Sequence, residues 1–125
     1  MRLFTFSFFF LLAPLFSLNA DEKKVTELAQ KRFDAAEKAF KSAPKDDNLP
    51  IIYFLSVRLL AAQKDLKSDS EIEAYQAHYN RMSKLDARFK ALAGGVRPEE
   101  SAYLQLFVVE AEFWLERAKL KKTKK

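Results

Sequence analysis

Apolar residues recur every three or four positions along most of this chain, which is the spacing of one face of an α-helix. Three polar or small-residue stretches interrupt the pattern, at 42–50, 67–71 and 93–98. They delimit four predicted helices at about 22–42, 50–66, 71–93 and 98–120. Two glycines and four prolines offer few of the turns that a sheet needs. We therefore predict an all-α protein of two antiparallel helical hairpins, forming a bundle or a coiled-coil-like array.

The first and third predicted helices each carry one apolar stripe, so each is expected to cover one neighbour and expose its charged residues to water. The stripe of the first helix is Ala29, Phe33, Ala36, Phe40 and Ala43, and that of the third is Tyr75, Tyr79, Met82, Leu85, Phe89 and Leu92.

The second and fourth predicted helices carry two apolar stripes each. Their broad stripes are Ile52, Leu55, Leu59, Ala62 and Leu66, and Tyr103, Phe107, Ala111, Trp114 and Ala118. Their second stripes are Tyr53, Val57 and Leu60, and Leu106, Val109, Phe113 and Leu120. A compact bundle needs one stripe per helix, so the second stripes are a candidate surface for a protein partner or a second copy. The alternative is a wide core face in a monomer.

The predicted helix ends have chemical signatures. Ser70 and Glu73 form a capping-box pattern before the third helix. Gly94 and Gly95 permit the left-handed backbone with which many helices end, and Pro98 suits the first turn of the next helix. These three residues predict the tip of a helical hairpin.

The first 20 residues have the layout of a secretory signal peptide. Arg2 precedes an apolar block, and Ala20 stands before the charged residues that start at Asp21. We expect cleavage after Ala20 and export to the periplasm or the cell exterior. An uncleaved membrane anchor is the alternative, because the block approaches the length of a spanning helix.

The remaining chain is predicted to be one helical domain, 21–120, followed by a basic tail, 121–125. From Arg117 onward there are six positive charges and no negative one, whereas the body of the domain is nearly balanced. Such an end could bind an anionic envelope surface, or it could simply complement the dipole of a solvated helix end. No nucleic-acid-binding motif is present, so we expect no nucleic-acid partner.

The sequence offers little catalytic or metal-binding chemistry. It has no cysteine and one histidine, His78, for which a solvated or packed position is expected, because one histidine is too few for a typical zinc site. A serine nucleophile would have only His78 as its base. The acidic loop at Asp46, Asp47 and Asn48 lacks the ligand spacing of a calcium loop and is expected to cap a helix or be solvated. We expect no catalytic residue, no metal and no cofactor.

An offset of 49 residues aligns segment 25–66 with segment 74–115, which suggests an internal repeat of one helix–loop–helix unit. Six aligned pairs are identical: Arg32 and Arg81, Phe40 and Phe89, Lys41 and Lys90, Leu55 and Leu104, Ala62 and Ala111, and Leu66 and Leu115.

The second unit, RFKALAGGVRPEESAYLQLFVVEAEFWLERAKL, resembles the hairpin repeat of the TolC-like outer membrane efflux proteins over about 30 residues. The residues that carry the resemblance are Phe89, Gly95, Leu104, Ala111, Glu112 and Leu115. Arg97 stands where a Ser or Thr cap is common, and the chain has no alternating segment that could form a barrel. The resemblance therefore implies a short exported relative or a hairpin accessory rather than a channel.

These features support two functional hypotheses. The first is a non-enzymatic exported protein that acts through helix–helix contacts and can associate with itself. The second is a membrane-associated accessory of a TolC-like efflux assembly or another envelope assembly.

Overall fold

A computed structural model describes residues 20–43, 48–66, 70–92 and 95–123. Within these ranges the chain forms four helices and no strand, which confirms the all-α prediction. The helices are α2 (Ala20–Ser42), α3 (Leu49–Lys64), α4 (Glu71–Lys90) and α5 (Pro98–Thr123). The last helix continues to Thr123 and thus includes Lys121 and Lys122 of the predicted basic tail.

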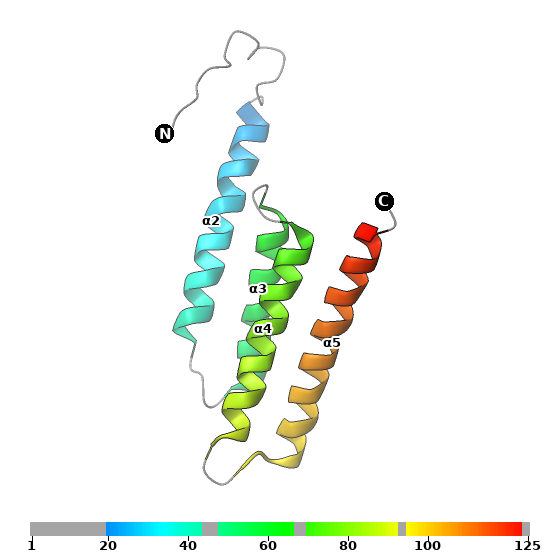
Figure 1. Ribbon diagram of the computed structural model, residues 1–125. Coiled ribbons are helices and arrows are strands. Elements are labelled where there is room, and N and C mark those ends of the chain that lie inside the picture. The colour runs from blue at the N-terminus through cyan, green and yellow to red at the C-terminus, as the bar shows by residue number, and fades with distance from the viewer. Residues whose placement is uncertain (1–19, 44–47, 67–69, 93–94, 124–125) are drawn as a thin grey trace.

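The helices pack mainly against their neighbours in the chain. Helix α2 packs on α3, α3 on α4 and α4 on α5, with a smaller contact between α3 and α5 (Figure 1). Helices α2 and α5 therefore form the two edges of the array, with α3 and α4 between them. Among the described helices, each edge helix has one face without a neighbouring helix, and what that face carries bears directly on function.

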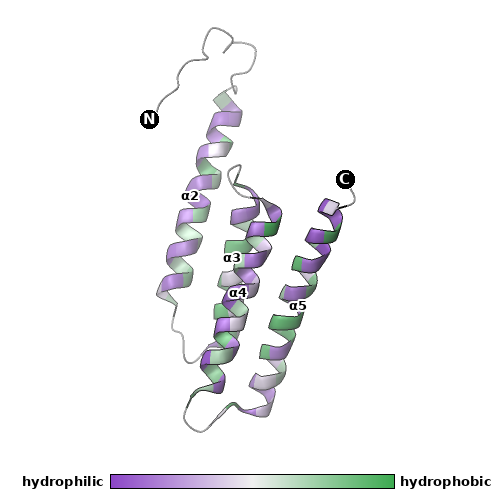
Figure 2. Ribbon diagram, viewed as in Figure 1, coloured by the Kyte–Doolittle hydropathy of each residue, from purple (hydrophilic) through white to green (hydrophobic). Residues whose placement is uncertain are grey.

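The hydrophobic core is built from α3, α4 and α5. Its buried side chains are Leu49, Ile52, Met82, Leu85, Phe89, Leu104, Phe107 and Ala111. Helix α2 is largely hydrophilic (Figure 2) and contributes no buried residue. Phe40, near the carboxyl end of α2, packs against the core. The predicted stripe of α2 is therefore only half-buried, apart from Ala43 just after the helix.

Helix α5 is rotated relative to the sequence prediction. Its buried residues are Leu104, Phe107, Ala111, Leu115 and Ala118. Tyr103, which we placed in the core stripe, is half exposed at 50 %, and Trp114 is half-buried. Leu104 and Leu115, each one position further along the chain, take the core positions that we assigned to these two aromatic residues.

Polar side chains cap the amino-terminal ends of α3 and α4. Ser70 and Glu73 form the predicted capping box, with Ser70 Oγ accepting from the Glu73 amide at 3.0 Å and Glu73 Oε1 accepting from the Ser70 amide at 2.7 Å. Asn48 caps α3 by accepting from the Ile51 amide at 3.1 Å. Its neighbours Asp46 and Asp47 lie outside the described residues.

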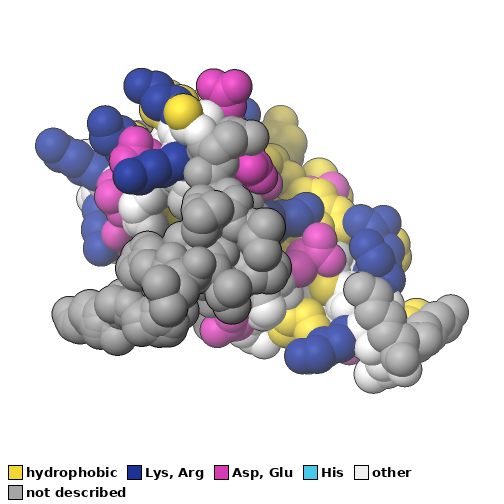
Figure 3. Space-filling model, turned by 90° about the horizontal axis from the view of Figure 1, so that it is seen from above, with side chains coloured by type: hydrophobic (Ala, Val, Ile, Leu, Met, Phe, Trp, Pro, Cys, Tyr) yellow, Lys and Arg dark blue, Asp and Glu magenta, His cyan; other side chains and the backbone are white. Residues whose placement is uncertain are grey.

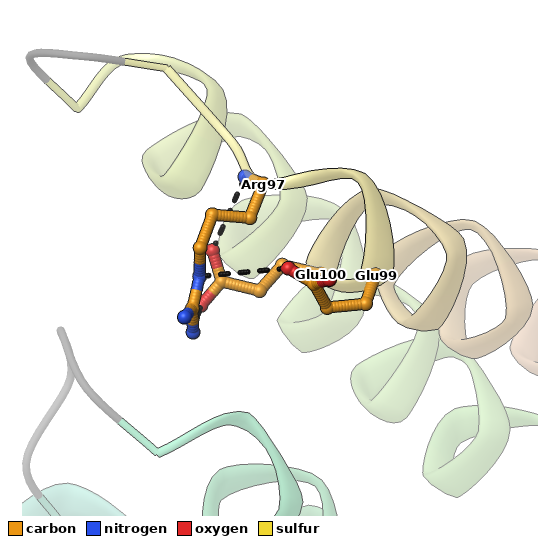
Figure 4. A network of polar contacts seen from close by, with 3 residues as sticks. All are labelled: Arg97, Glu99 and Glu100. Carbon is orange, nitrogen blue, oxygen red and sulfur yellow. Dashed lines mark hydrogen bonds and ion pairs between the residues drawn. The ribbon is translucent and has the colours of Figure 1, made fainter.

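In the first turn of α5, Glu100 reaches back to Arg97, the residue before the helix, as the glutamate of a capping box does. Its carboxylate accepts from the Arg97 amide at 3.4 Å and from the Arg97 guanidinium at 3.0 Å (Figure 4). These hydrogen bonds lower the pKa of Glu100, the guanidinium bond most. Glu99 adds a second ion pair to Arg97 at 3.8 Å. The arrangement stabilises the start of α5, where Arg97 stands in place of Ser or Thr.

The turn between α4 and α5 contains a left-handed residue, as predicted. Gly95 has a φ of +77°, which glycine adopts without a side-chain clash. Pro98 is the first residue of α5. The helix before the turn ends earlier than we predicted, at Lys90 rather than near 93, with Ala91 as its cap. Gly94 lies outside the described residues.

Candidate interaction surface

The outward side of α5 carries a row of exposed apolar side chains, here called the outer face. It consists of Leu106, Val109, Phe113 and Leu120, which are 55–56 % exposed. The buried residues of α5 lie on the opposite side of the helix, because Ala111 is about 180° from the centre of this row at 100° per residue. The outer face therefore points away from the bundle.

The outer face has the spacing of a coiled-coil seam. Leu106, Val109 and Phe113 follow at steps of three and four, and Leu120 lies one heptad beyond Phe113. Glu116 occupies the remaining seam position. Arg117 lies beside the seam with its guanidinium 5.0 Å from the centre of the Phe113 ring, so part of this apolar surface already has a cation on it.

Charge along α5 is segregated by sign. From Pro98 to Glu116 the helix has five carboxylates and no cationic side chain, and from Arg117 to Thr123 it has four cations and no carboxylate. Glu112 is exposed and forms no hydrogen bond or ion pair within the described part of the chain. Lys119 forms an ion pair with Glu116 at 3.1 Å. The outer face is thus flanked by carboxylates in its first half and by cations at its end.

The second stripe of α3 faces inward. Leu60 is buried, and Tyr53 and Val57 are half-buried. The Tyr53 ring stacks on Phe107 at 4.2 Å between centroids, and its hydroxyl donates to Glu110 Oε1 at 2.5 Å. Burial, with the neighbouring Glu110 carboxylate, raises the pKa of Tyr53 to about 12. Tyr53 therefore joins α3 to α5 within one molecule, and Leu60 is buried, so the exposed part of the predicted surface is the outer face of α5.

A second, smaller apolar area lies on α2. Val25 and Leu28 are exposed and line an open groove of about 720 Å³ between α2 and the end of α3. The groove also contains the ion pair between Arg32 and Asp65, at 2.6 Å. Two apolar residues of α3, Ile51 and Phe54, are exposed elsewhere. None of these groups extends over as many helical turns as the outer face of α5.

The interior contains a polar cluster that the sequence analysis missed. Ser56 on α3 and His78 on α4 are both 0 % exposed, with Ser56 Oγ 2.8 Å from His78 Nδ1. Arg81 donates from Nε to Ser56 Oγ at 2.7 Å and from Nη2 to the Ser56 carbonyl at 3.0 Å. Ser56 lies at core spacing between Ile52 and Leu59, which is the signal that could have revealed it.

The surroundings of His78 favour the neutral form of its ring. Ser56 Oγ accepts from Arg81 and shares a further hydrogen bond with His78 Nδ1, in which the donor depends on the tautomer of the ring. His78 Nε2 is buried and has no hydrogen-bond partner. The ring stacks on Trp114 at 5.7 Å between centroids. Burial, and to a smaller degree the charge of Arg81, lowers the pKa of His78 to about 4.

A serine beside a histidine is also the arrangement of a nucleophile and its base, but this pair is poorly suited to catalysis. Neither side chain is reached by solvent, and a histidine with a pKa of about 4 is a weak base near neutral pH. Arg81 remains a cation although burial lowers its pKa to about 10. The geometry favours a role in fixing α4 on α3.

Other classes of site find little support in the described residues. No group of three or more His, Cys, Asp or Glu side chains there could hold a metal ion. In the same ranges, no helix is both long and apolar enough to cross a membrane. The chain matches no protein-family model, and neither curated proteins nor solved structures gave a match.

Proposed function

We propose that this chain is an exported helical protein without enzymatic activity, which acts by pairing the outer face of α5 with an apolar helix surface, first of all that of a second copy. The observation that carries the proposal is the exposure of Leu106, Val109, Phe113 and Leu120 at coiled-coil spacing. A side chain of this kind gains roughly 1.5–3 kcal/mol on full burial, so leaving four exposed on one helix is unfavourable unless a partner covers them.

The position of α5 supports pairing by this helix in particular. It is an edge helix, and the opposite side of it is fixed to the core by Leu104, Phe107 and Ala111. Its orientation is also fixed by the hydrogen bond from Tyr53 to Glu110. A rigidly held face loses little conformational entropy when it binds, which favours association.

Export is part of the proposal and rests on the leader pattern of residues 1–20, of which 1–19 lie outside the described residues. Helix α2 begins at Ala20, so cleavage after Ala20 would remove only its first residue. The likeness to the TolC-like hairpin repeat remains a prediction from the sequence.

A membrane-associated accessory of an envelope assembly is the second candidate, favoured by the charge at the end of α5. Arg117, Lys119, Lys121 and Lys122 lie within two turns, together with the exposed Leu120. Seen from above, Lys and Arg side chains are exposed at several places, among Asp, Glu and hydrophobic side chains (Figure 3). This candidate predicts binding to vesicles containing anionic lipid that weakens as salt is raised.

The pairing proposal is tested with the double variant Leu106→Lys, Phe113→Lys. Because both side chains are exposed, the variant should keep its helicity and become monomeric in sedimentation experiments. The matched control is Ile51→Lys, Phe54→Lys, which removes two exposed apolar side chains from α3 and should leave the native mass unchanged. If the α5 variant unfolds, its side chains belong to the core, and if its mass equals that of the wild type, the outer face is not the interface.

A further inference from the structure

The charges beside the outer face of α5 specify how two copies would pair. The following inference rests on the proposed function and concerns its geometry. We infer that two copies pair through α5 in an antiparallel arrangement, with Val109 of one copy opposite Leu120 of the other, and with carboxylates of each copy meeting cations of the other on both flanks.

Two flanks border the outer face, and each carries one carboxylate and one cation a heptad apart. Glu110 and Arg117 lie on the flank towards α3, where Glu110 accepts from Tyr53. Glu112 and Lys119 lie on the other flank. In coiled coils, charged residues at such flanking positions determine the orientation of the partner helix.

An antiparallel pair brings each flank against the same flank of the second copy, because its two-fold axis is perpendicular to the helices. With Val109 opposite Leu120, Glu110 approaches Arg117 of the second copy and Glu112 approaches Lys119 of the second copy. The symmetry repeats both contacts, so four ion pairs surround the apolar seam. Glu116, the charged position within the seam, lies opposite Phe113 and away from its own symmetry mate.

A parallel pair is less favourable. Opposite flanks then meet, so Glu112 approaches Arg117 of the second copy, while Glu110 meets only Gln105. The seam also places Glu116 against Glu116 of the second copy, and like charges that face each other are destabilising. Two attractive contacts and a repulsive one therefore replace four attractive ones.

Charge reversal distinguishes the two arrangements. In the antiparallel pair, Glu112→Lys or Lys119→Glu alone sets like charges against each other twice, and each should weaken dimerisation about tenfold. An equimolar mixture of the two variants should form heterodimers with about wild-type affinity, because positions 112 and 119 of opposite chains then carry opposite charges again. The two positions are two turns apart on one helix, so this rescue requires two chains. Sedimentation equilibrium at low salt measures the affinities.

The outcomes separate this inference from the proposed function. Rescue in the mixture supports the antiparallel register. If Glu112→Lys is rescued by Arg117→Glu and Lys119→Glu has no effect, pairing through α5 stands and the antiparallel arrangement is overturned. If the wild type is monomeric at every concentration, the pairing proposal itself fails.

Spin labels give a direct second test, because the chain has no cysteine of its own. A single label at Glu99→Cys, near the start of α5, is clear of the overlapping part of the antiparallel pair. At 1.5 Å per residue the two labels should be about 45 Å apart in the dimer. A parallel pair would bring them within about 15 Å, close to the spacing of two packed helices, and that distance would overturn the inference.

Discussion

Ser56 Oγ lies 2.8 Å from His78 Nδ1 at a point of the interior where neither residue is exposed to solvent. The contact joins α3 to α4, and Arg81 holds the serine by two further hydrogen bonds. A buried polar cluster of this kind stabilises one helix register over others, since a shifted register would leave its donors unpaired. It is a structural feature from which three of the following predictions derive.

The first prediction concerns the titration of His78. Its pKa in the folded protein is about 4, against an ordinary value of 6.5, because burial disfavours the charged ring. It is the only histidine in the chain, so its ring signals in an NMR titration are unambiguous. We expect little shift of these signals between pH 7 and pH 5. A midpoint near 6.5 would contradict the buried position.

The second prediction is a loss of stability in acid. The unfolded state binds a proton to His78 below pH 6.5, whereas the folded state binds it only near pH 4, so stability falls as pH falls through this window. The full loss is about 3 kcal/mol, at about 1.4 kcal/mol per pKa unit. Urea unfolding at several pH values measures it. In a His78→Gln variant the dependence on pH should be weaker over the same range.

The third prediction tests the cluster by mutation. Ser56→Ala leaves His78 Nδ1 and Arg81 Nε without their partner in the interior, and should lower the free energy of unfolding by about 2–3 kcal/mol. Ser101→Ala, at an exposed serine of α5, is the control and should change it by less than about 0.5 kcal/mol. Equal effects of the two substitutions would show that the cluster does not stabilise the fold.

A fourth prediction concerns the turn before α5. Gly95 has a φ of +77°, and a Cβ built there would meet no atom within 4 Å. The penalty of Gly95→Ala is therefore one of backbone conformation alone, about 1–2 kcal/mol. Gly95→Asn should be less destabilising, because Asn tolerates this conformation better. Thermal unfolding of both variants provides the comparison, and a fully stable Gly95→Ala protein would contradict the left-handed turn.

The fifth prediction concerns export. Expressed with its own leader in a bacterium, the protein should be recovered outside the cytoplasm with an N-terminus at Asp21, as N-terminal sequencing or intact mass would show. Recovery of the full-length chain in the membrane fraction would contradict cleavage and favour the membrane-associated candidate.

Local signals in the sequence predicted the helices well. Periodicity located the helices to within a few residues, and the pattern of Ser70 and Glu73 predicted a capping box that the structure contains. Such features depend on residues close together in the chain, so they can be derived from it without knowledge of the packing.

Features that depend on packing were less predictable. Tyr103 and Leu104 are adjacent apolar residues, and only the packing of α5 on the neighbouring helices determines that Leu104 is buried and Tyr103 exposed. The contact between Ser56 and His78 joins residues 22 positions apart on different helices. Periodicity also could not show that the second stripe of α3 faces inward whereas that of α5 faces outward. The inward position of Tyr53 depends on its contacts with Phe107 and Glu110 of α5.

The claim that the outer face of α5 pairs two copies is tested most directly by the native mass of the chain from Asp21 onward, measured by sedimentation equilibrium over a wide range of concentrations. We predict a reversible dimer that dissociates on dilution, with no change in helicity. A monomer at all concentrations would contradict the account, because Leu106, Val109, Phe113 and Leu120 would then remain exposed without a second copy to cover them.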